Sequence, residues 1–301
     1  MTQQQRVALD ARFRQPQPAV PPTLEELRDG FAGLMASLGV PSGFRADPTT
    51  LGPRPALHVQ PEEGGRPGTL LYFHGGSYVM GSPTTALTLT ANLVVRTGVS
   101  AFSVDYRLAP EHPYPAGPDD ALAAYRALLD DGVDPATVVL AGDSAGGGLS
   151  VATCLAARRA GLPTPAAVVA FSAGLDLTRT GRSMTTKAAL DPFFTREGFD
   201  QTAALYLAGQ DPATELLSPA TLADLTDFPP LLLQVGTNEM LLDDSTRLAA
   251  RAVEAGVDVT LDVVAGVPHV FQAFTGLLDE AGQALDRAAL FITQHLPAPG
   301  A

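Results

Sequence analysis

The chain has 301 residues, 46% of them hydrophobic, and a formal net charge of -13. The hydrophobic content excludes wholesale disorder and is sufficient for a sizeable core. The acidic charge argues against nucleic acid or an anionic membrane surface as a partner, and no apolar run reaches the roughly 18 residues that a membrane span requires.

The first 50 residues are expected to form an N-terminal segment separate from the main domain. Residues 1–14 lack the apolar core of a signal peptide. A helix is predicted from Thr23 to Leu38, because Thr23 can act as its N-cap and Glu26 stands at the capping-box position. A Gly- and Pro-rich stretch from Gly39 to Pro55 follows this helix.

Residues 51–301 are expected to form one α/β domain, because short apolar runs alternate with helical segments. Most of these runs are continuously apolar, which is typical of strands buried on both faces of a sheet. The pattern predicts a mostly parallel sheet with helices on both faces. The predicted strands are Leu57–Val59, Thr69–Phe73, Val99–Val104, Val138–Leu140, Ala166–Phe171, Leu231–Val235 and Val259–Val264. The predicted helices are Ala86–Arg96, Asp119–Leu129, Ala145–Ala160, Ser245–Ala255 and Leu277–His295.

One region interrupts this alternation. Between Phe171 and Leu231 the sequence contains no convincing strand, only a helical stretch near Glu197–Leu207. A connection of this length in a compact domain is usually functional. We therefore expect an excursion over about residues 175–215 that forms a cap with the N-terminal helix. Within it, Phe193 and Phe194 either line an acyl pocket or anchor the cap by burial.

The only cysteine, Cys154, lies in the predicted helix 145–160, so no intrachain disulfide can form. Its expected role is that of a small buried apolar residue. A cytoplasmic location is expected on this basis.

Residues 142–146 read Gly-Asp-Ser-Ala-Gly and lie between a predicted strand and a predicted helix. A serine at such a turn has an exposed Oγ, and the flanking glycines permit a sharp turn without a Cβ clash. The helix N-terminus directs free N–H groups toward the atom that the serine attacks. Ser144 is therefore the candidate nucleophile. Asp143 either positions the backbone of neighbouring loops or favours the helix N-terminus.

A serine nucleophile requires a general base, and the chain has five histidines. His269 follows the last predicted strand, at the carboxyl end of the sheet where sites form, and is the best candidate. His58 lies in a predicted strand and His295 near a helix C-terminus, so both are interpreted as structural. His112 lies in residues 105–113, a segment that is interpreted as structural. His74 precedes two glycines and is interpreted as holding their loop rather than as the base.

The orienting acid is expected between Ser144 and His269 in the chain. The segment after the strand Leu231–Val235 contains Glu239, Asp243 and Asp244. Asp244 is placed to cap the helix that follows, whereas Glu239 and Asp243 both remain candidates for the acid.

The sequence His74-Gly75-Gly76-Ser77 follows another predicted strand. Its glycines allow backbone N–H groups to approach a carbonyl oxygen, and the N–H of Ala145 would complete an oxyanion hole. The expected donors are Gly75, Gly76 and Ala145, with His74 holding the loop by hydrogen bonding.

These segments together resemble the hormone-sensitive-lipase family of α/β-hydrolases, in its bacterial esterase branch with the GDSAG motif. The matching residues are 74–77, 105–113, 142–146 and 268–269, in the order typical of the family. The resemblance implies an α/β-hydrolase fold with an eight-stranded sheet and a small helical cap. It also implies hydrolysis of short-chain carboxylic esters, no cofactor, and possible homodimers through a sheet edge.

The resemblance also favours one acid. The family carries an aspartate thirty residues before its histidine, and Glu239 holds that position here. Glutamate can present the same carboxylate to an imidazole, so Glu239 is preferred to Asp243. Ser77 is a second departure, because the family usually has glycine there. In residues 105–113, Arg107 and Glu111 are expected to pair and pin their loop behind Ser144.

The sequence therefore predicts a carboxylesterase that acts on a small-molecule ester. Ser144 would attack the carbonyl with His269 as base and Glu239 stabilising the imidazolium, through an acyl-enzyme intermediate. The alternatives are hydrolysis of amides, lactones or thioesters by the same triad, or a non-catalytic ligand-binding homologue. No cluster of His, Cys and Asp has metal-ligand spacing, so no metal is expected.

Overall fold

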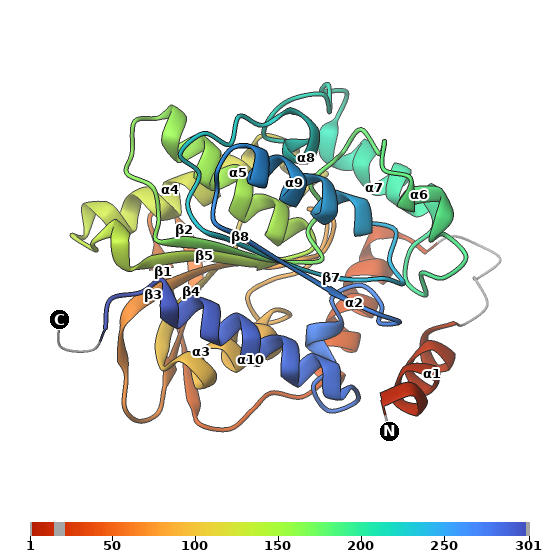
Figure 1. The fold of residues 1–301 in the computed structure, drawn as a ribbon, viewed down its shortest axis with the longest axis horizontal. Coiled ribbons are helices and arrows are strands. Elements are labelled where there is room, and N and C mark those ends of the chain that lie inside the picture. The colour runs from red at the N-terminus through yellow and green to blue at the C-terminus, as the bar shows by residue number, and fades with distance from the viewer. Residues whose placement is uncertain (1, 15–21, 299–301) are drawn as a thin grey trace.

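The computed structural model of the chain describes residues 2–14 and 22–298. Its centre is an eight-stranded sheet with the strand order β1-β2-β4-β3-β5-β6-β7-β8 (Figure 1). The strands are β1 (Phe44–Leu51), β2 (Arg54–Pro61), β3 (Arg66–Phe73), β4 (Val99–Val104), β5 (Val138–Asp143), β6 (Ala167–Phe171), β7 (Leu231–Gly236) and β8 (Val259–Val264). β2 pairs antiparallel with both of its neighbours, β1 and β4, and all the other pairings are parallel. The predicted fold class, a mostly parallel eight-stranded α/β sheet, is confirmed.

Helices cover both faces of the sheet, as its buried strands require. In Figure 1 one face carries α4 (Ala116–Asp130), α5 (Ala145–Arg159), α8 (Pro219–Leu222) and α9 (Leu242–Glu254), and the other carries α3 (Leu87–Thr97) and α10 (Asp279–Gln294). These six helices cover the two faces over most of their extent. The five helices predicted after residue 51 are confirmed, each with ends shifted by a few residues.

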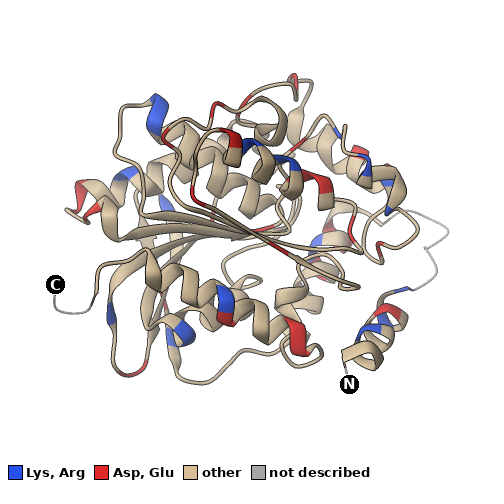
Figure 2. Ribbon diagram, in the orientation of Figure 1, with Lys and Arg blue, Asp and Glu red and all other residues tan. Residues whose placement is uncertain are grey.

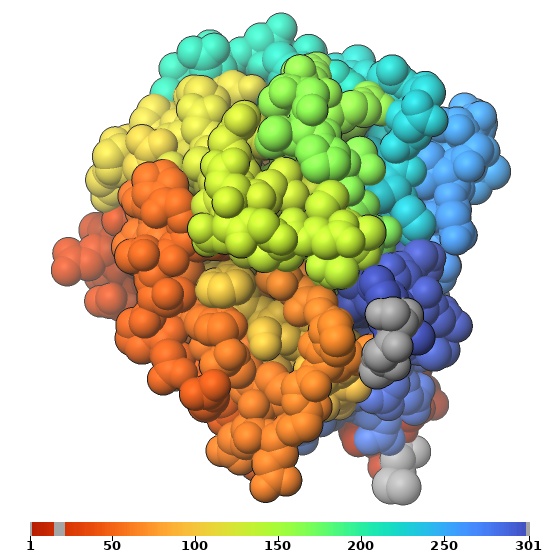
Figure 3. Space-filling model, turned by 90° about the vertical axis from the view of Figure 1, so that its left-hand side faces the viewer, coloured from red at the N-terminus to blue at the C-terminus, as the bar shows by residue number. Residues whose placement is uncertain are grey.

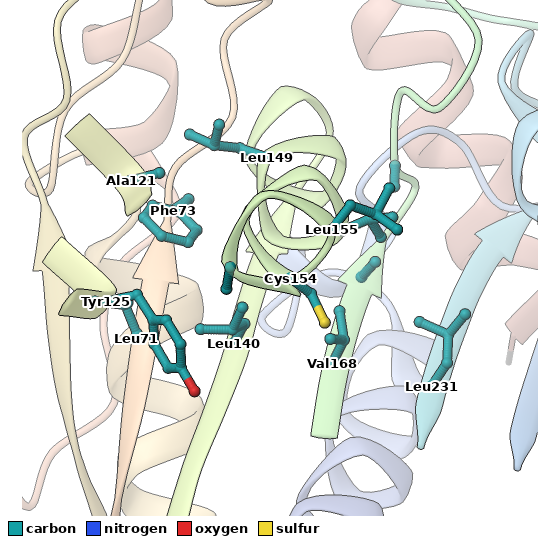
Figure 4. Close-up of a cluster of buried hydrophobic side chains, with 14 of the residues drawn as sticks. Leu71, Phe73, Ala121, Tyr125, Leu140, Leu149, Cys154, Leu155, Val168 and Leu231 are labelled. Atoms are coloured by element: carbon teal, nitrogen blue, oxygen red, sulfur yellow. The ribbon is translucent and has the colours of Figure 1, made fainter. Parts of the chain in front are cut away.

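Each face of the sheet has its own apolar core. On the first face, Leu71, Leu140 and Val168 from the strands pack against Leu149 and Leu155 of α5 (Figure 4). Cys154 lies in the same cluster and is buried, as predicted. Burial of this kind stabilises the fold by about 25 cal/mol for each Å² of apolar surface that is removed from water.

Most charged residues belong to the helices and loops, and the strands of the sheet carry few of them (Figure 2). The face at the left of Figure 1 is covered by segments that lead into the strands, coloured orange and yellow-green, and by the blue end of α10 (Figure 3). No helix within residues 2–14 and 22–298 is long and apolar enough to cross a membrane.

The opposite end of the sheet carries the additional helices. There lie α1 (Thr2–Phe13), α2 (Leu24–Ser37), α6 (Ser183–Thr186) and α7 (Arg196–Leu207), at the right of Figure 1. The predicted capping box of α2 is confirmed, since Glu26 N donates to Thr23 Oγ1 and Thr23 N donates to the Glu26 carboxylate. The helix predicted near Glu197–Leu207 is α7. Residues 1 and 15–21 of the expected N-terminal segment fall outside the described residues.

The strand β1 and the helix α1 were not predicted from the sequence. β1 lies in the stretch that was interpreted as a Gly- and Pro-rich connection, and it carries Pro48 and a single buried residue, Leu51. As an edge strand it needs no continuous apolar pattern, and Pro is tolerated there. α1 is polar along most of its length, with Leu9 as its only buried residue.

Two predicted contacts are wrong. Arg107 does not pair with Glu111 but with Asp120, to which it donates from its guanidinium at 2.8–3.1 Å, while Glu111 pairs with Arg28 of α2 at 2.7 Å. Asp120 is buried and therefore requires a charged partner, whereas Glu111 is exposed.

Asp244 was expected to cap the helix after it, and this is also wrong. Because α9 begins at Leu242, Asp244 lies inside its first turn. Its carboxylate instead accepts hydrogen bonds from the backbone N–H groups of Leu175 and Asp176, at 2.8 and 3.0 Å. Burial raises its pKa to about 7.

Candidate active site

Ser144 lies at the turn between β5 and α5, with φ 53° and ψ -119°. This left-handed conformation is unusual for a residue other than glycine and is maintained only where the surroundings enforce it. The neighbouring glycines explain how the turn fits. A Cβ on Gly142 would lie 2.4 Å from the carbonyl carbon of Gly146, and a Cβ on Gly146 would lie 1.9 Å from the carbonyl oxygen of Phe73.

The backbone of Ser144 is held on both sides. Its N–H donates to the carbonyl of Phe171 at 2.8 Å, and its own carbonyl accepts from Gly148 and Gly174 at 3.1 and 3.0 Å. Ala145 is the first residue of α5, so its N–H has no acceptor within the helix and points out of the helix N-terminus. The side chain is thereby fixed at the carboxyl end of the sheet with a helix dipole behind it.

His269 follows β8, and its Nε2 lies 2.9 Å from Ser144 Oγ. Its ring contacts Phe194 edge to face, with centroids 4.8 Å apart, and only 7% of the residue is exposed. Burial alone would lower the pKa of His269, but the hydrogen bond and negative charge of Glu239 outweigh it and leave the pKa raised. The imidazole is therefore placed to accept a proton from the serine hydroxyl.

Glu239 follows β7 and is fully buried. Its Oε2 lies 2.8 Å from His269 Nδ1, and its Oε1 accepts from Gly236 N at 2.5 Å and from Ser172 Oγ at 2.9 Å. The carboxylate is thus paired with three donors, which a buried charge requires. Hydrogen bonds connect Glu239, His269 and Ser144 in one continuous chain.

Asp243, the other candidate acid, is engaged elsewhere. Its carboxylate accepts from the backbone N–H of Ser183 at 3.0 Å, and its own N–H donates to Ser183 Oγ at 3.0 Å. These bonds attach α6 to the first turn of α9.

Ser172 is a site residue that the sequence analysis did not identify. It follows β6 with φ 47°, and its hydroxyl donates to Glu239 and accepts from the backbone N–H of Val270 at 3.0 Å. One hydroxyl therefore connects the acid to the residue beside His269. A polar residue directly after a buried strand was the available signal, since site residues in parallel sheets follow strand ends.

The glycine loop after β3 lies beside Ser144. Gly76 has φ 123°, and a Cβ there would lie 2.2 Å from the carbonyl oxygen of Met80, so only glycine fits. His74 holds the loop as predicted, because its Nδ1 donates to the Gly75 carbonyl at 2.8 Å and its ring stacks on Tyr106 with centroids 4.2 Å apart. Burial lowers the pKa of His74 to about 4, so it is neutral at pH 7.

Asp143 faces this glycine loop, because a Cβ on Gly75 would clash with its carboxylate. Burial raises its pKa to about 6, opposed by hydrogen bonds that include those from the Tyr72 hydroxyl and the Gly75 backbone. The bond from Tyr72 measures 2.8 Å. Asp143 therefore positions the backbone of a neighbouring loop, which was one of its two predicted roles.

Asp191 was not assigned a role from the sequence. Its carboxylate accepts from the backbone N–H groups of Phe193, Phe194 and Met240, at 2.9–3.1 Å. Burial raises its pKa. Asp191 thus ties the turn that carries both phenylalanines to the residue after Glu239.

Two cavities open beside Ser144. The smaller, of about 30 Å³, is lined by residues of α7 and of the segment after β6, together with Ala145. The larger, of about 700 Å³, is lined by α2, by the start of α7, and by His269, Phe193 and Phe194. Phe193 also packs on Phe13 and Phe274, so the phenylalanines both line a cavity and anchor neighbouring elements.

Two of the other histidines lie in structural surroundings. His58 stacks on Phe102 with centroids 4.3 Å apart, and His295 Nδ1 lies 2.8 Å from the carbonyl of Phe291. Within residues 2–14 and 22–298, no group of three or more His, Cys, Asp or Glu side chains is placed to hold a metal ion.

The chain is similar in sequence to known hydrolases. The model of the alpha/beta hydrolase fold family matches residues 70–273. An acetyl-hydrolase of Streptomyces hygroscopicus is 44% identical over 257 residues, which cover 85% of this chain and 84% of that protein. The carboxylesterase NlhH of Mycobacterium tuberculosis is 32% identical over 237 residues, covering 76% and 74%.

Among solved structures, an esterase from the bacterial hormone-sensitive lipase family superposes with a TM-score of 0.92. It is 39% identical in sequence, and the match covers 98% of this chain and 99% of that one. The similarity therefore extends over the sheet, the additional helices and the site.

Proposed function

The chain belongs to the α/β-hydrolase fold family, in its hormone-sensitive-lipase branch, and is a carboxylic ester hydrolase. On that premise we propose that it cleaves short-chain acyl esters with Ser144 as nucleophile, His269 as general base and Glu239 as the acid. The observation that carries the proposal is the hydrogen-bonded chain from Glu239 through His269 to Ser144, at 2.8 and 2.9 Å. The name of one relative, acetyl-hydrolase, supports a short acyl group, and the name of another, carboxylesterase, supports an ester bond.

In the first half-reaction, Ser144 Oγ attacks the ester carbonyl carbon while His269 Nε2 takes the hydroxyl proton. The imidazolium that forms is stabilised by Glu239, which also fixes the proton of Nδ1 on the side of the carboxylate. His269 then gives its proton to the leaving alcohol oxygen, and an acyl-enzyme remains on Ser144.

The negative oxygen of the tetrahedral intermediate requires donors that are already in place. The proposed donors are the backbone N–H groups of Gly75, Gly76 and Ala145. Gly76 and Ala145 carry most of this role, because each lines a cavity at Ser144, whereas the Gly75 backbone hydrogen-bonds Asp143. Loss of one such donor typically raises the barrier by about 3–4 kcal/mol.

In the second half-reaction, water takes the place of the alcohol. His269 removes a proton from this water as it attacks the acyl carbon, and then returns the proton to Ser144 Oγ. The same three side chains thus serve both half-reactions, and the proposed chemistry needs no cofactor.

We also propose a cap that consists of α2 and of α7 with its flanking residues. α2 belongs to the N-terminal segment of residues 1–50, and α7 belongs to the excursion of about residues 175–215. Support comes from the large cavity, whose walls combine α2 and α7 with the catalytic loops. Arg28 of α2 joins this segment to the domain, since it donates to the carbonyls of Val79 and Ala109 at 2.9 and 3.1 Å.

A homodimer through the edge strand β8 is a further part of the proposal. β8 ends the sheet, and its side chains Leu261 and Val263 are exposed. An exposed apolar edge strand can pair with a second copy. Light scattering on Leu261→Asp, with Leu290→Asp of the exposed face of α10 as control, would test this assembly. A cytoplasmic location is likewise proposed, on the single buried thiol of Cys154.

The test of the catalytic proposal is hydrolysis of p-nitrophenyl acetate and butyrate by the wild type and by Ser144→Ala. We expect turnover by the wild type and its loss in Ser144→Ala, with circular dichroism showing that both are folded. Turnover retained in Ser144→Ala would remove the serine from its role. Hydrolysis of amides or lactones but not of these esters would point to the alternative leaving groups.

A further inference from the structure

The two cavities meet at the nucleophile. Ser77, Ser144 and Thr202 line both of them, so one small molecule can extend from one cavity into the other across Ser144. Their volumes differ widely, at about 30 Å³ and about 700 Å³. An ester bound at Ser144 therefore has one short arm and one long arm.

The catalytic geometry decides which arm is which. When Ser144 attacks, the carbonyl oxygen points to the oxyanion donors, and the alcohol oxygen must lie close to His269 Nε2 to receive its proton. His269 lines the large cavity and does not line the small one. The alcohol portion consequently extends into the large cavity and leaves the small cavity to the acyl chain.

Resting on the function proposed above, we propose that the enzyme is selective for acetate-sized esters of bulky, apolar alcohols. The small cavity is the acyl pocket, and the large cavity is the alcohol pocket. Phe193 and Phe194, for which the sequence suggested a place in an acyl pocket, line the alcohol pocket.

Packed rings and a cation line the small cavity. Phe199 is buried there, and the guanidinium of Arg179 lies over the Phe199 ring at 4.4 Å. Tyr206 is buried and stacks on Tyr78 with ring centroids 4.0 Å apart. A volume of about 30 Å³ corresponds to two or three water-sized spheres of about 10–15 Å³ each, which suits a small group such as methyl. A longer acyl chain would have to displace packed rings and contact a cation.

The large cavity is apolar and has a size typical of sites for small organic ligands. Its apolar lining includes Leu27, Phe31 and Leu34 of α2 and Leu205 of α7. Apart from His269, the charged or titratable side chains among its described lining residues are all acidic: Glu26, Asp143 and Glu197. An alcohol portion with its own negative charge is therefore disfavoured.

A pair of isomeric esters tests the proposal without a change in composition. Hexyl acetate and ethyl hexanoate have the same atoms and similar hydrophobicity, but they place the six-carbon chain on opposite sides of the ester bond. Both leaving groups are simple primary alcohols, so their intrinsic reactivity is similar. We expect kcat/KM for hexyl acetate to exceed that for ethyl hexanoate by at least about tenfold. A ratio of one or below would overturn the assignment.

A second comparison adds a filled pocket. Gly30 lines the large cavity and has no atom within 4 Å of an added Cβ, whereas Gly33 lies on the same helix with equal space but away from the cavity. Gly30→Phe should reduce the ratio of kcat/KM for hexyl acetate to kcat/KM for ethyl acetate several-fold. Gly33→Phe should leave this ratio unchanged. Equal effects of the two variants would contradict the alcohol-pocket assignment.

Opening the small cavity gives the complementary result. In Phe199→Ala, kcat/KM for ethyl hexanoate should increase several-fold relative to ethyl acetate, and no increase in a folded variant would count against the acyl-pocket assignment. If Phe199→Ala does not fold, the ratio of kcat/KM for hexyl acetate to that for ethyl hexanoate in the wild type decides which cavity holds the acyl chain. Absence of all ester turnover would instead refute the function on which this inference rests.

Discussion

The hydroxyl of Ser172 lies 2.9 Å from Glu239 Oε1 and 3.0 Å from the backbone N–H of Val270. It donates to the acid and accepts from the residue next to His269, so it fixes two members of the proposed triad relative to each other. The position of Ser172 depends on β6, which lies between β5, the strand before Ser144, and β7, the strand before Glu239. The loops that carry Ser144, Glu239 and His269 follow β5, β7 and β8, so the sheet aligns them with only β6 between the first two.

Ser172→Ala should lower kcat by about tenfold, because the lost hydrogen bonds are worth about 1–2 kcal/mol and leave Val270 N–H without its acceptor. Steady-state kinetics on p-nitrophenyl acetate measure the effect. The matched control is Ser103→Ala, since Ser103 is buried in β4 with no hydrogen-bond partner for its Oγ among the described residues. Similar kcat values in the two variants would exclude a positioning role for Ser172.

Glu239→Gln should lower kcat/KM by about 10³- to 10⁴-fold, because an amide at this position no longer stabilises the imidazolium or the required tautomer. Asp243→Asn should stay within a few-fold of the wild type, since Asp243 bonds to Ser183 and not to His269. The same ester assay measures both variants. If Asp243→Asn is the variant that loses activity, the acid role moves to Asp243.

Activity should fall at acidic pH with a midpoint above the ordinary histidine value of about 6.5. The neutral imidazole is the proposed base. The hydrogen bond and charge of Glu239 raise the pKa of His269 despite its burial. The profile of log kcat/KM against pH measures this midpoint. Asp143 also titrates in this range, with a pKa raised by burial to about 6, so Asp143→Asn provides the control and should retain the acid limb. A wild-type midpoint well below 6.5 would contradict the assignment.

The same shift has a consequence for stability. Because the pKa of His269 is raised on folding, the protonated imidazole stabilises the folded state below the unfolded pKa, and this contribution is lost as the pH rises through the folded pKa. The residue should therefore favour folding under mildly acidic conditions, in which lower activity is expected. Urea unfolding of the wild type and His269→Ala at several pH values would measure this difference.

Asp120→Ala should lower the free energy of unfolding by about 1–3 kcal/mol, because the buried carboxylate holds the backbone and the guanidinium of Arg107. Urea denaturation measures this loss. Asp200→Ala is the control, as Asp200 pairs with Arg196 on an exposed face of α7 and such pairs contribute about 0–1 kcal/mol. Equal losses of unfolding free energy in Asp120→Ala and Asp200→Ala would show that the buried ion pair contributes no more to stability than the exposed one.

The strands and helices of the domain could be predicted because their residues carry local signals. β5 and β7 are buried throughout, and both the capping box at Thr23 and the turn at Ser144 have short sequence patterns. The edge strand β1 has no such pattern, since only Leu51 is buried in it. Its pairing with β2 is an interaction between segments, which the local sequence of β1 does not encode.

Partners distant in the chain were harder to predict. Arg107 was assigned to Glu111, its near neighbour in sequence, although burial of Asp120 selects a different partner. The role of Ser172 depends on the meeting of three loops from β6, β7 and β8. A resemblance to known proteins supplied the spacing of Glu239 but gave no reason to single out Ser172.

The most direct test of the catalytic account is to detect the acyl group on the enzyme. The wild type is mixed with excess p-nitrophenyl acetate, quenched in acid within the first turnover and digested for mass spectrometry. We expect a burst of p-nitrophenol close to one equivalent when deacylation is slower than acylation, and one acetyl group on the peptide that contains Ser144. Acetylation of another residue, or turnover without any acetylated peptide under conditions that show a burst, would contradict the proposed mechanism.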